Sequence, residues 1–315
     1  MQQIFPEYVQ KYIKDQGENG LQKGTLRRNL SDIAHFLSWI KKRCSSDDLE
    51  VIGQLTSQDF QEYIQSIEEK QLSPATIKRR LSVLKGFLRY LDINAPAVLK
   101  EGSKGRPMRP LSSDDFVTPK ELQKLLRSMR SKGDIAVQAA RDFLIDRNVA
   151  IVYLLRFYGL TPSLISSIVM NDINLARKTL AISSEGAPKT IELADEHIKP
   201  IRDYLKSIDP LLRPRYRSED PLFVAFNNKT NSFQFDYAVG MPKKLSVRAI
   251  QKFLKDEVDR ASLRKISSQH LRRTAILDAL KSGLPEIVSY FGLSDDFSLW
   301  RYRQYLLNTE TPKAD

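Results

Sequence analysis

The sequence is poor in the residues that cross-link small folds or bind metals: it has one cysteine, Cys44, and three histidines among 315 residues. A single thiol cannot form a disulfide within the chain, and we interpret Cys44 as a surface thiol near a helix end. The histidines are scattered and give no cluster with the spacing of metal ligands. We therefore expect no disulfide framework, no metal site and no other cofactor.

Long apolar runs are also missing. The longest run, Val149–Leu155, ends at Arg156, far short of the roughly 20 residues that span a bilayer. The N-terminus, MQQIFPEYVQKYIK, mixes apolar and charged residues from its start and lacks the basic and apolar regions of a signal peptide. These absences predict a cytoplasmic protein without a membrane partner.

What the chain has in excess is positive charge. It carries 50 Lys and Arg against 38 Asp and Glu, a net charge of +12 at pH 7, and its pI is about 9.6. The surplus is concentrated in residues 70–110, which hold ten basic residues and only two acidic ones. Cationic surfaces attract polyanions because binding releases condensed counterions. We expect a nucleic acid as the partner; the alternative is an ordinary solvated helix face.

Helical periodicity dominates the first third of the chain. Residues 74–91 give the clearest helix, with Ser73 as N-cap, Pro74 at the first helical position and one apolar stripe opposite a basic side. Further helices are predicted over 4–15, 25–43 and 56–70. These helices define an all-helical domain over 1–95. A basic linker rich in Pro, Gly and Ser follows over 96–117.

The remainder, 118–315, is predicted to be mainly helical with a small β-sheet. A strongly apolar helix is predicted over 140–157, and alternating residues over 179–184 and 190–194 predict a β-hairpin. Further helices are predicted over 195–208, 246–261, 267–282, 284–291 and 296–308. The stretch 210–245 reads as irregular. The fold class is therefore mostly α, in two domains.

Three segments resemble the tyrosine recombinase, or phage integrase, family. LTSQDFQEYIQSIEEKQLSPATIKRRLSVLKGFLRYL (55–91) resembles its SAM-like core-binding domain. IDRNVAIVYLLRFYGLTPSLISSIVMNDINLARKTLAI (145–182) looks like the start of its catalytic domain, and ISSQHLRRTAILDALKSGLPEIVSYFGLSDDFSLWRYRQYL (266–306) looks like the end. The resemblance implies the tyrosine-recombinase fold, with two domains that clamp DNA.

The family's chemistry tells which residues matter. A tyrosine attacks a DNA phosphodiester and forms a 3′-phosphotyrosyl link, while two arginines hold the non-bridging oxygens. A lysine on a β-hairpin protonates the leaving 5′-oxygen, and histidines complete the site. By the resemblance, Arg272 corresponds to the family's second arginine. Tyr302, ten residues beyond Gly292, corresponds to the family's tyrosine. The other four positions hold Thr161 (first arginine), Ser184 (lysine), Gln269 and Leu293 (histidines).

Four replacements among six positions predict that the chain is not an enzyme. Thr161 offers one donor and no charge in place of a guanidinium, and the loss of one preorganised donor costs on the order of 10²–10³ in rate. We therefore expect a catalytically inactive fold that acts as a sequence-specific DNA-binding regulator. It resembles the recombinase-like repressors with which some temperate phages hold lysogeny. That resemblance implies a phage or mobile element in a bacterial host, and a place at the nucleoid.

Two alternatives stay open. One is an active site-specific recombinase that uses Tyr302, which predicts a covalent adduct with nicked DNA that Tyr302→Phe abolishes. The other is an architectural subunit of an active integrase, which predicts weak binding alone and cooperative binding with that partner. The short segment after Tyr302 leaves self-association on DNA, or contact with a partner protein, open as well.

The expected DNA contacts are side chains able to bond phosphates or base edges. Base-edge contacts are expected near Thr76, Arg80 and Arg248. The full set is Thr76, Lys78, Arg79, Arg80, Lys85, Arg106, Lys189, Lys243, Lys244, Arg248, Arg272, Arg273 and Arg301.

Overall fold

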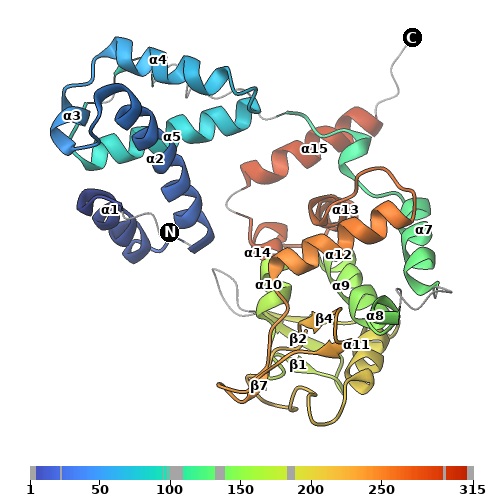
Figure 1. Ribbon diagram of the computed structural model, residues 1–315. Helices are drawn as coiled ribbons and strands as arrows, with labels where there is room; N and C mark the ends of the chain where they lie inside the picture. The colour runs from blue at the N-terminus through green and yellow to red at the C-terminus, as the bar shows by residue number, and fades with distance from the viewer. Residues whose placement is uncertain are drawn as a thin grey trace. The chain divides into compact units, whose positions relative to one another are not determined.

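The chain was studied as a computed structural model. The structure describes residues 5–21, 23–94, 96–97, 99, 109–131, 139–182, 189–293 and 296–310. It forms two compact units, Met1–Met108 and Arg109–Asp315, each with a hydrophobic core of its own (Figure 1). The boundary between the units, after Met108, falls inside the segment expected as a linker. Leu111 and Phe116 of that segment belong to a hydrophobic core of the second unit.

Unit 1 is helical throughout its described part. Its helices are α1 (Glu7–Glu18), α2 (Lys23–Cys44), α3 (Leu49–Gly53), α4 (Ser57–Glu68) and α5 (Pro74–Tyr90). Helix α2 packs along α5 (Figure 1), and both helices contribute buried residues to the hydrophobic core of unit 1. Phe36 from α2 meets Tyr63 from α4 edge-on, with ring centroids 5.1 Å apart. Such aromatic contacts supply much of a small core, since each ring removes a large apolar area from water.

The starts of α4 and α5 follow from local sequence. Thr56 and Asp59 form a reciprocal capping box at the start of α4, in which each side chain accepts a backbone N–H of the other residue. The Ser73 hydroxyl accepts the amide N–H of Thr76 at 3.2 Å, and Pro74 occupies the first turn of α5. Both devices satisfy amide groups that the helix itself leaves without partners. The structure thus confirms both of these predicted helix starts.

Unit 2 is organised around a buried helix. Its helices are η1 (Ser113–Asp115), α7 (Pro119–Arg130), α8 (Ala139–Asp142), α9 (Ile145–Phe157), α10 (Pro162–Ser167), α11 (Asp195–Ser207), α12 (Val247–Arg260), α13 (Ser268–Lys281), α14 (Ile287–Phe291) and α15 (Phe297–Glu310). Every residue of α9 from Arg147 to Arg156 is buried. Helices α7, α11, α12 and α13 pack around it (Figure 1). A helix that is apolar on all sides is expected in such a central position.

A three-stranded antiparallel sheet lies beside α11. Its strands β1 (Ile173–Asn174), β2 (Thr179–Ile182) and β3 (Lys189–Glu192) follow the order β1-β2-β3. The register pairs Leu180 with Ile191 and Ile182 with Lys189. Leu180, Ile182 and Ile191 are buried, so these paired positions form the inward face of the hairpin.

Several elements differ from the sequence-based expectation. The helix predicted over 140–157 is broken at Leu144, whose φ of −104° and ψ of 0° are not helical, into α8 and α9. The stretch 210–245 contains two short hairpins, β4 (Phe226–Asn227) with β5 (Ser232–Phe233), and β6 (Phe235–Asp236) with β7 (Met241–Pro242). These two-residue strands are too short to produce a periodic signal. The predicted fold class, mostly helical with a small sheet, is confirmed. In the described part of the chain, no helix is both long and apolar enough to cross a bilayer.

Gly159 generates the first testable prediction. Its φ is +59°, and a Cβ placed on it would lie 2.7 Å from Phe291 Cδ1. Gly159→Ala should lower the free energy of unfolding by about 2–4 kcal/mol, because left-handed strain adds to overpacking. The control is Gly240→Ala, at φ +71° with nothing within 4 Å of the added Cβ, which should cost about 1 kcal/mol. Urea unfolding measures both, and equal losses would show that Phe291 yields without cost.

Candidate active site

Tyr302 lies in the interior face of α15. It is 8% exposed and belongs to a core cluster with Phe116, with which its ring makes an edge-on contact at 6.3 Å. Burial raises the pKa of the Tyr302 phenol, but the positive charges of Arg273, Arg272 and Arg301 act in the opposite direction. A phenol is thus held in an apolar setting close to three guanidinium groups. Cations that favour the phenolate are what a tyrosine nucleophile requires.

Arg272 on α13 is the most constrained of these arginines. Its guanidinium donates to the carbonyl oxygens of Gly159 and Phe291 and lies over the Phe291 ring, 5.8 Å from the centroid. Burial lowers the pKa of Arg272, and the neighbouring Tyr302 phenol acts against that shift. Two carbonyl acceptors fix the fork of the guanidinium without neutralising its charge. The group is therefore preorganised to meet an anion.

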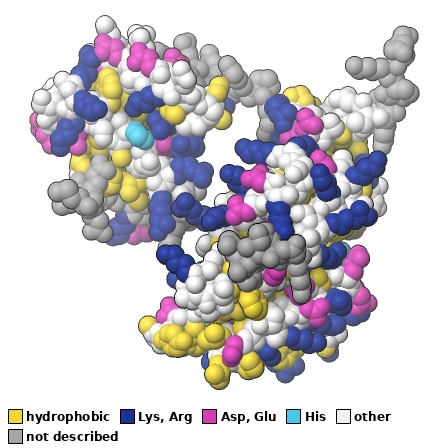
Figure 2. Space-filling model, turned by 45° about the vertical axis from the view of Figure 1, so that its right-hand side comes forward, with side chains coloured by type: hydrophobic (Ala, Val, Ile, Leu, Met, Phe, Trp, Pro, Cys, Tyr) yellow, Lys and Arg dark blue, Asp and Glu magenta, His cyan; other side chains and the backbone are white. Residues whose placement is uncertain are grey.

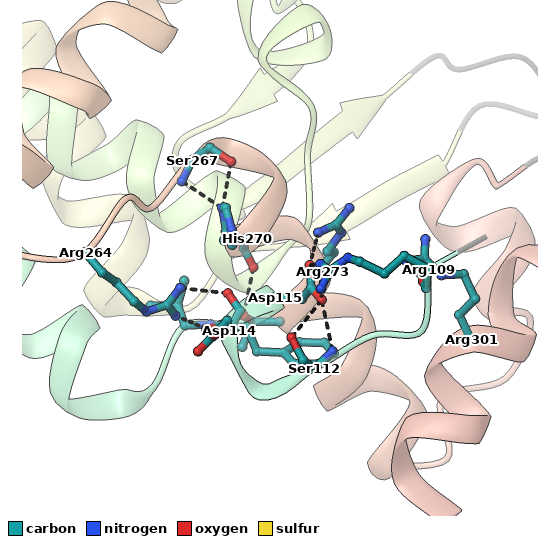
Figure 3. A network of polar contacts seen from close by, with 12 residues as sticks. Arg109, Ser112, Asp114, Asp115, Arg264, Ser267, His270, Arg273 and Arg301 are labelled. Atoms are coloured by element: carbon teal, nitrogen blue, oxygen red, sulfur yellow. Dashed lines mark hydrogen bonds and ion pairs between the residues drawn. The ribbon is translucent and has the colours of Figure 1, made fainter. Parts of the chain in front are cut away.

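Asp115 ties the segment before α7 to the same site (Figure 3). Its carboxylate accepts from Arg109 at 2.7 and 2.8 Å, from Arg273 at 2.6 Å and from the Ser112 amide at 3.0 Å. Arg301 donates to the backbone carbonyl of Arg109 at 2.6 Å. Burial alone would raise the pKa of Asp115, but these hydrogen bonds and the charges of Arg273 and Arg109 lower it. The carboxylate thus fixes Arg273 and orders the chain next to Arg301.

Lys189 reaches the site from the sheet. It is the first residue of β3, and its Nζ lies 4.0 Å from the centroid of the Tyr290 ring on α14. Burial, and then the positive charge of Arg272, lower the pKa of Lys189 to about 8. The structure therefore brings a lysine that readily gives up its proton next to Arg272.

The described positions where the family pattern is replaced have structural roles. The Thr161 hydroxyl accepts the Leu164 amide at 3.2 Å and caps α10. Leu293 packs half-buried against the core that surrounds Tyr302. Gln269 is exposed and lines a cavity of about 540 Å³ formed with α12. Ser184 lies outside the described residues. None of these three described side chains supplies a charge to the site.

The His270 side chain takes part in the N-terminal cap of its own helix, α13. Its Nδ1 lies 3.0 Å from the Ser267 amide and 2.8 Å from the Ser267 hydroxyl, which completes a capping box at the start of α13 (Figure 3). Burial, and then the charges of Arg264 and Arg273, lower the pKa of His270. The side chain is turned back along its own helix, so it positions α13 and does not complete the site in place of Gln269.

Sequence reasoning missed Asp115 and Tyr290. Asp115 fell in the expected linker, although Ser112 three residues earlier forms the serine-x-x-acid pattern of a capping box. That pattern could have indicated an ordered turn. No local signal marks Tyr290, because its role depends on the distant Lys189.

In unit 1 the expected DNA contacts fall into two groups. Arg79 and Arg80 both pair with the buried carboxylate of Asp32 on α2, and Nε and Nη1 of Arg80 are buried without a hydrogen-bond partner. Lys78 and Lys85 are partly exposed on α5. The guanidinium of Arg80 is thus inside unit 1 and not at an open surface where a base edge could reach it. Lys78 and Lys85 are the better candidates for phosphate contacts.

The remaining basic candidates lie near the start of α12. Lys243, Lys244 and Arg248 are exposed. The remaining candidate of unit 1, Thr76 on α5, shares a hydrogen bond of 2.8 Å with Ser73. Lys and Arg side chains are frequent on the faces of both units that Figure 2 presents. Arg106 lies outside the described residues. Within the described ranges, no group of three or more His, Cys, Asp or Glu side chains could hold a metal ion.

The chain thus combines a helical unit that carries the basic helix α5 with a helical unit in which arginine charges act on Tyr302. Residues 40–92 match the phage integrase N-terminal SAM-like domain. The chain is 24% identical over 255 residues to tyrosine recombinase XerC of Pelotomaculum thermopropionicum, with 80% of this chain and 77% of that protein covered. It is 22% identical over 276 residues to tyrosine recombinase XerD of Bifidobacterium longum, with 84% and 80% covered.

Solved structures agree on the fold. XerH site-specific recombinase bound to difH substrate aligns with a TM-score of 0.62 at 18% identity, covering 96% of this chain and 82% of XerH. The Tn1549 transposon integrase in complex with circular intermediate DNA aligns with a TM-score of 0.60 at 16% identity, covering 96% and 99%. The structure therefore has the tyrosine recombinase fold.

These relatives correct one expectation. The chain was expected not to be an enzyme because four of six family positions are replaced, and that prediction is wrong. The relatives that align over four fifths of the chain are named tyrosine recombinases, which are enzymes. The prediction counted family residues at fixed positions along the sequence. In the structure, the charge of Arg273 also acts on Tyr302, and Lys189 lies within the influence of Arg272.

Asp115 generates the second prediction. Asp115→Asn should lower the free energy of unfolding at pH 7 by about 2–3 kcal/mol, because Arg109 and Arg273 lose a charged acceptor. The pKa of Asp115 is lowered in the folded state, so its stabilisation is present above the unfolded pKa near 3.8 and is lost as the pH falls through the folded pKa. The difference from wild type should therefore shrink in acid. Exposed Asp114 supplies the control Asp114→Asn; a pH-independent loss at Asp115 would contradict the role of its charge.

Proposed function

We propose that the chain binds double-stranded DNA and exchanges strands at specific sites, with Tyr302 as the nucleophile. The observation that carries the proposal is the buried Tyr302 phenol, on which the positive charges of Arg272, Arg273 and Arg301 act. The names of its relatives support the same activity. The solved neighbours bound to DNA support DNA as the substrate.

The geometry suggests how the reaction would proceed. The Tyr302 phenol loses its proton and its oxygen attacks the phosphorus. A tyrosyl–phosphate bond forms, the bond to the 5′-oxygen breaks, and that oxygen takes up a proton to leave as a hydroxyl. Because burial disfavours the phenolate, the arginines must stabilise the negative charge that moves from phenol to phosphate. Arg272 is the best placed, since its carbonyl partners hold it without neutralising it. No metal is required for this charge stabilisation.

A second candidate is regulation of transcription in a phage or mobile element through binding at specific sites. The observation in its favour is Thr161, whose hydroxyl is occupied as the cap of α10 and contributes no charge to the site. Site-specific binding is common to both functions. A map of bound sites in the source organism separates them, since several promoters would favour regulation and one attachment-like inverted repeat would favour recombination.

The third prediction concerns Tyr302. DNA selected by the protein from a random duplex library, rebuilt with a nick beside the cleavage position, should give a covalent adduct on a denaturing gel. Tyr302→Phe should abolish the adduct and leave DNA affinity within about threefold of wild type, because only the nucleophilic oxygen is removed. The control is Tyr305→Phe, one turn later on α15 and packed against the same Phe116 ring at 4.6 Å. Tight, specific binding without an adduct in the wild type would overturn the proposal.

The fourth prediction concerns phosphate contacts of unit 1. Lys78→Gln and Lys85→Gln should each weaken DNA binding at all sequences and reduce the slope of log affinity against log salt by about one. The matched control is Lys14→Gln on α1, where the lysine is exposed and faces Glu18. Fluorescence anisotropy over a salt series measures the slope. Unchanged slopes for both α5 variants would exclude this face of the helix.

A further inference from the structure

Arg147, in the first turn of α9, is a buried cation whose hydrogen-bond partners are all uncharged. The residue is only 4% exposed. Its Nε and Nη2 donate to the side-chain oxygen of Asn148 at 3.2 and 3.1 Å, and its Nη1 donates to the carbonyl oxygen of Val224 at 2.9 Å. A guanidinium has five N–H donors, so one N–H on each terminal nitrogen is left for a further acceptor.

The charge of Arg147 is not offset within the described part of the chain. Burial lowers the pKa of Arg147 to about 10, and the neighbouring Tyr204 hydroxyl is the group that acts in the opposite direction. Arg141, which is also largely buried in unit 2, is instead paired with the Glu257 carboxylate at 2.7 Å. Because an unpaired charge is costly to bury, an anion bound beside Arg147 would be strongly favoured.

A cavity of about 340 Å³ lies beside Arg147. This volume falls at the lower end of the roughly 300–1,000 Å³ that is typical of small-molecule sites. Lys243, Lys244 and Lys252 also line the cavity, and Asp256 is the acidic side chain among the described lining residues. Four basic side chains against one acidic side chain make the cavity attractive to a small anion.

The same cavity has an aromatic side. Phe226 of β4 and Phe253 of α12 line it and are both half-buried. Aromatic rings are surfaces on which nucleic-acid bases stack. Asn228 and Gln234 add amide groups to the lining, and an amide can both donate to and accept from the edge of a base. The cavity therefore offers contacts for a planar heterocycle as well as for an anion.

We propose that this cavity binds a free nucleoside monophosphate, with the phosphate at the basic side chains and the base against the two phenylalanine rings. The phosphate would accept the two spare N–H groups of Arg147 and offset its buried charge. A base within a duplex is stacked and paired and would have to be extruded to enter a cavity, so a free nucleotide fits better than the DNA substrate. Tyr302 and Arg272 do not line the cavity, and the inference goes beyond the proposed strand transfer.

The fifth prediction is tested by isothermal titration calorimetry of the full chain without DNA. The probes are AMP, GMP, CMP and UMP, with the matching nucleosides and inorganic phosphate as the separate halves of the ligand. At least one nucleotide should bind once per chain with a Kd below about 1 mM. It should bind at least about tenfold tighter than its nucleoside or inorganic phosphate, because each half meets only one side of the cavity. Failure of all four nucleotides to saturate the chain would overturn the proposal.

Two variants locate the bound nucleotide. Arg147→Met should weaken its binding about tenfold or more, the usual effect of losing a charged hydrogen bond. Arg147 also supports the Val224 carbonyl, so the exposed Lys252 supplies a variant that spares the core. Lys252→Gln should weaken binding about threefold at low salt and less at high salt. The matched control is Lys255→Gln, an exposed lysine of α12 outside this lining, which should leave the affinity unchanged.

Two outcomes with these variants would contradict the assignment. Unchanged nucleotide affinity in both Arg147→Met and Lys252→Gln would place the nucleotide elsewhere on the chain. A loss of duplex affinity in Arg147→Met as large as its loss of nucleotide affinity would assign the cavity to the DNA backbone. Because neither measurement involves strand cleavage, failure of the proposed function and failure of this inference are told apart.

Discussion

The bonds from Arg272 to the carbonyls of Gly159 and Phe291 are the contacts on which the rest of the site depends. They join the end of α9, the start of α13 and the end of α14 through one side chain. Gly159 can take part because its left-handed backbone leaves room for the Phe291 ring. Carbonyl oxygens satisfy the buried N–H groups, yet they carry no net charge. A buried guanidinium held in this way keeps its attraction for a phosphate.

The positive charges of Arg273 and Lys189 are balanced differently from that of Arg272. Arg273 shares the Asp115 carboxylate with Arg109, so its charge is offset and its orientation is fixed. Lys189 has no carboxylate partner among the described residues, and its charge is disfavoured by burial and by Arg272. The three groups therefore differ in how their charge is balanced. The charge of Arg272 is held by uncharged carbonyl groups, that of Arg273 is offset by Asp115, and that of Lys189 is disfavoured by its surroundings.

Sequence reasoning succeeded where the cause is local. The caps of α4 and α5 are decided within four residues, and the hairpin between β2 and β3 follows from alternation. It was less informative where the cause is distant. The burial of Arg80 depends on Asp32, a residue of another helix, and the role of Asp115 depends on Arg273 near the end of the chain. A basic residue on an amphipathic helix is predicted to be exposed unless the carboxylate that pairs with it, distant in the sequence, is known.

The expectation of an inactive enzyme shows a further limit of motif reasoning. A phosphate responds to charge at a point in space, and neighbouring strands of a hairpin present their side chains to the same region. The resemblance places this lysine at Ser184, which lies outside the described residues, whereas Lys189 at the start of β3 lies within the influence of Arg272. Thr161 is different, because its hydroxyl is used by the α10 amides and its neighbour Arg156 pairs with Asp278 at 2.8 Å. The first arginine of the pattern thus has no substitute from its own segment. The positive charge that acts on the phenol therefore comes from α13 and α15, which carry Arg272, Arg273 and Arg301.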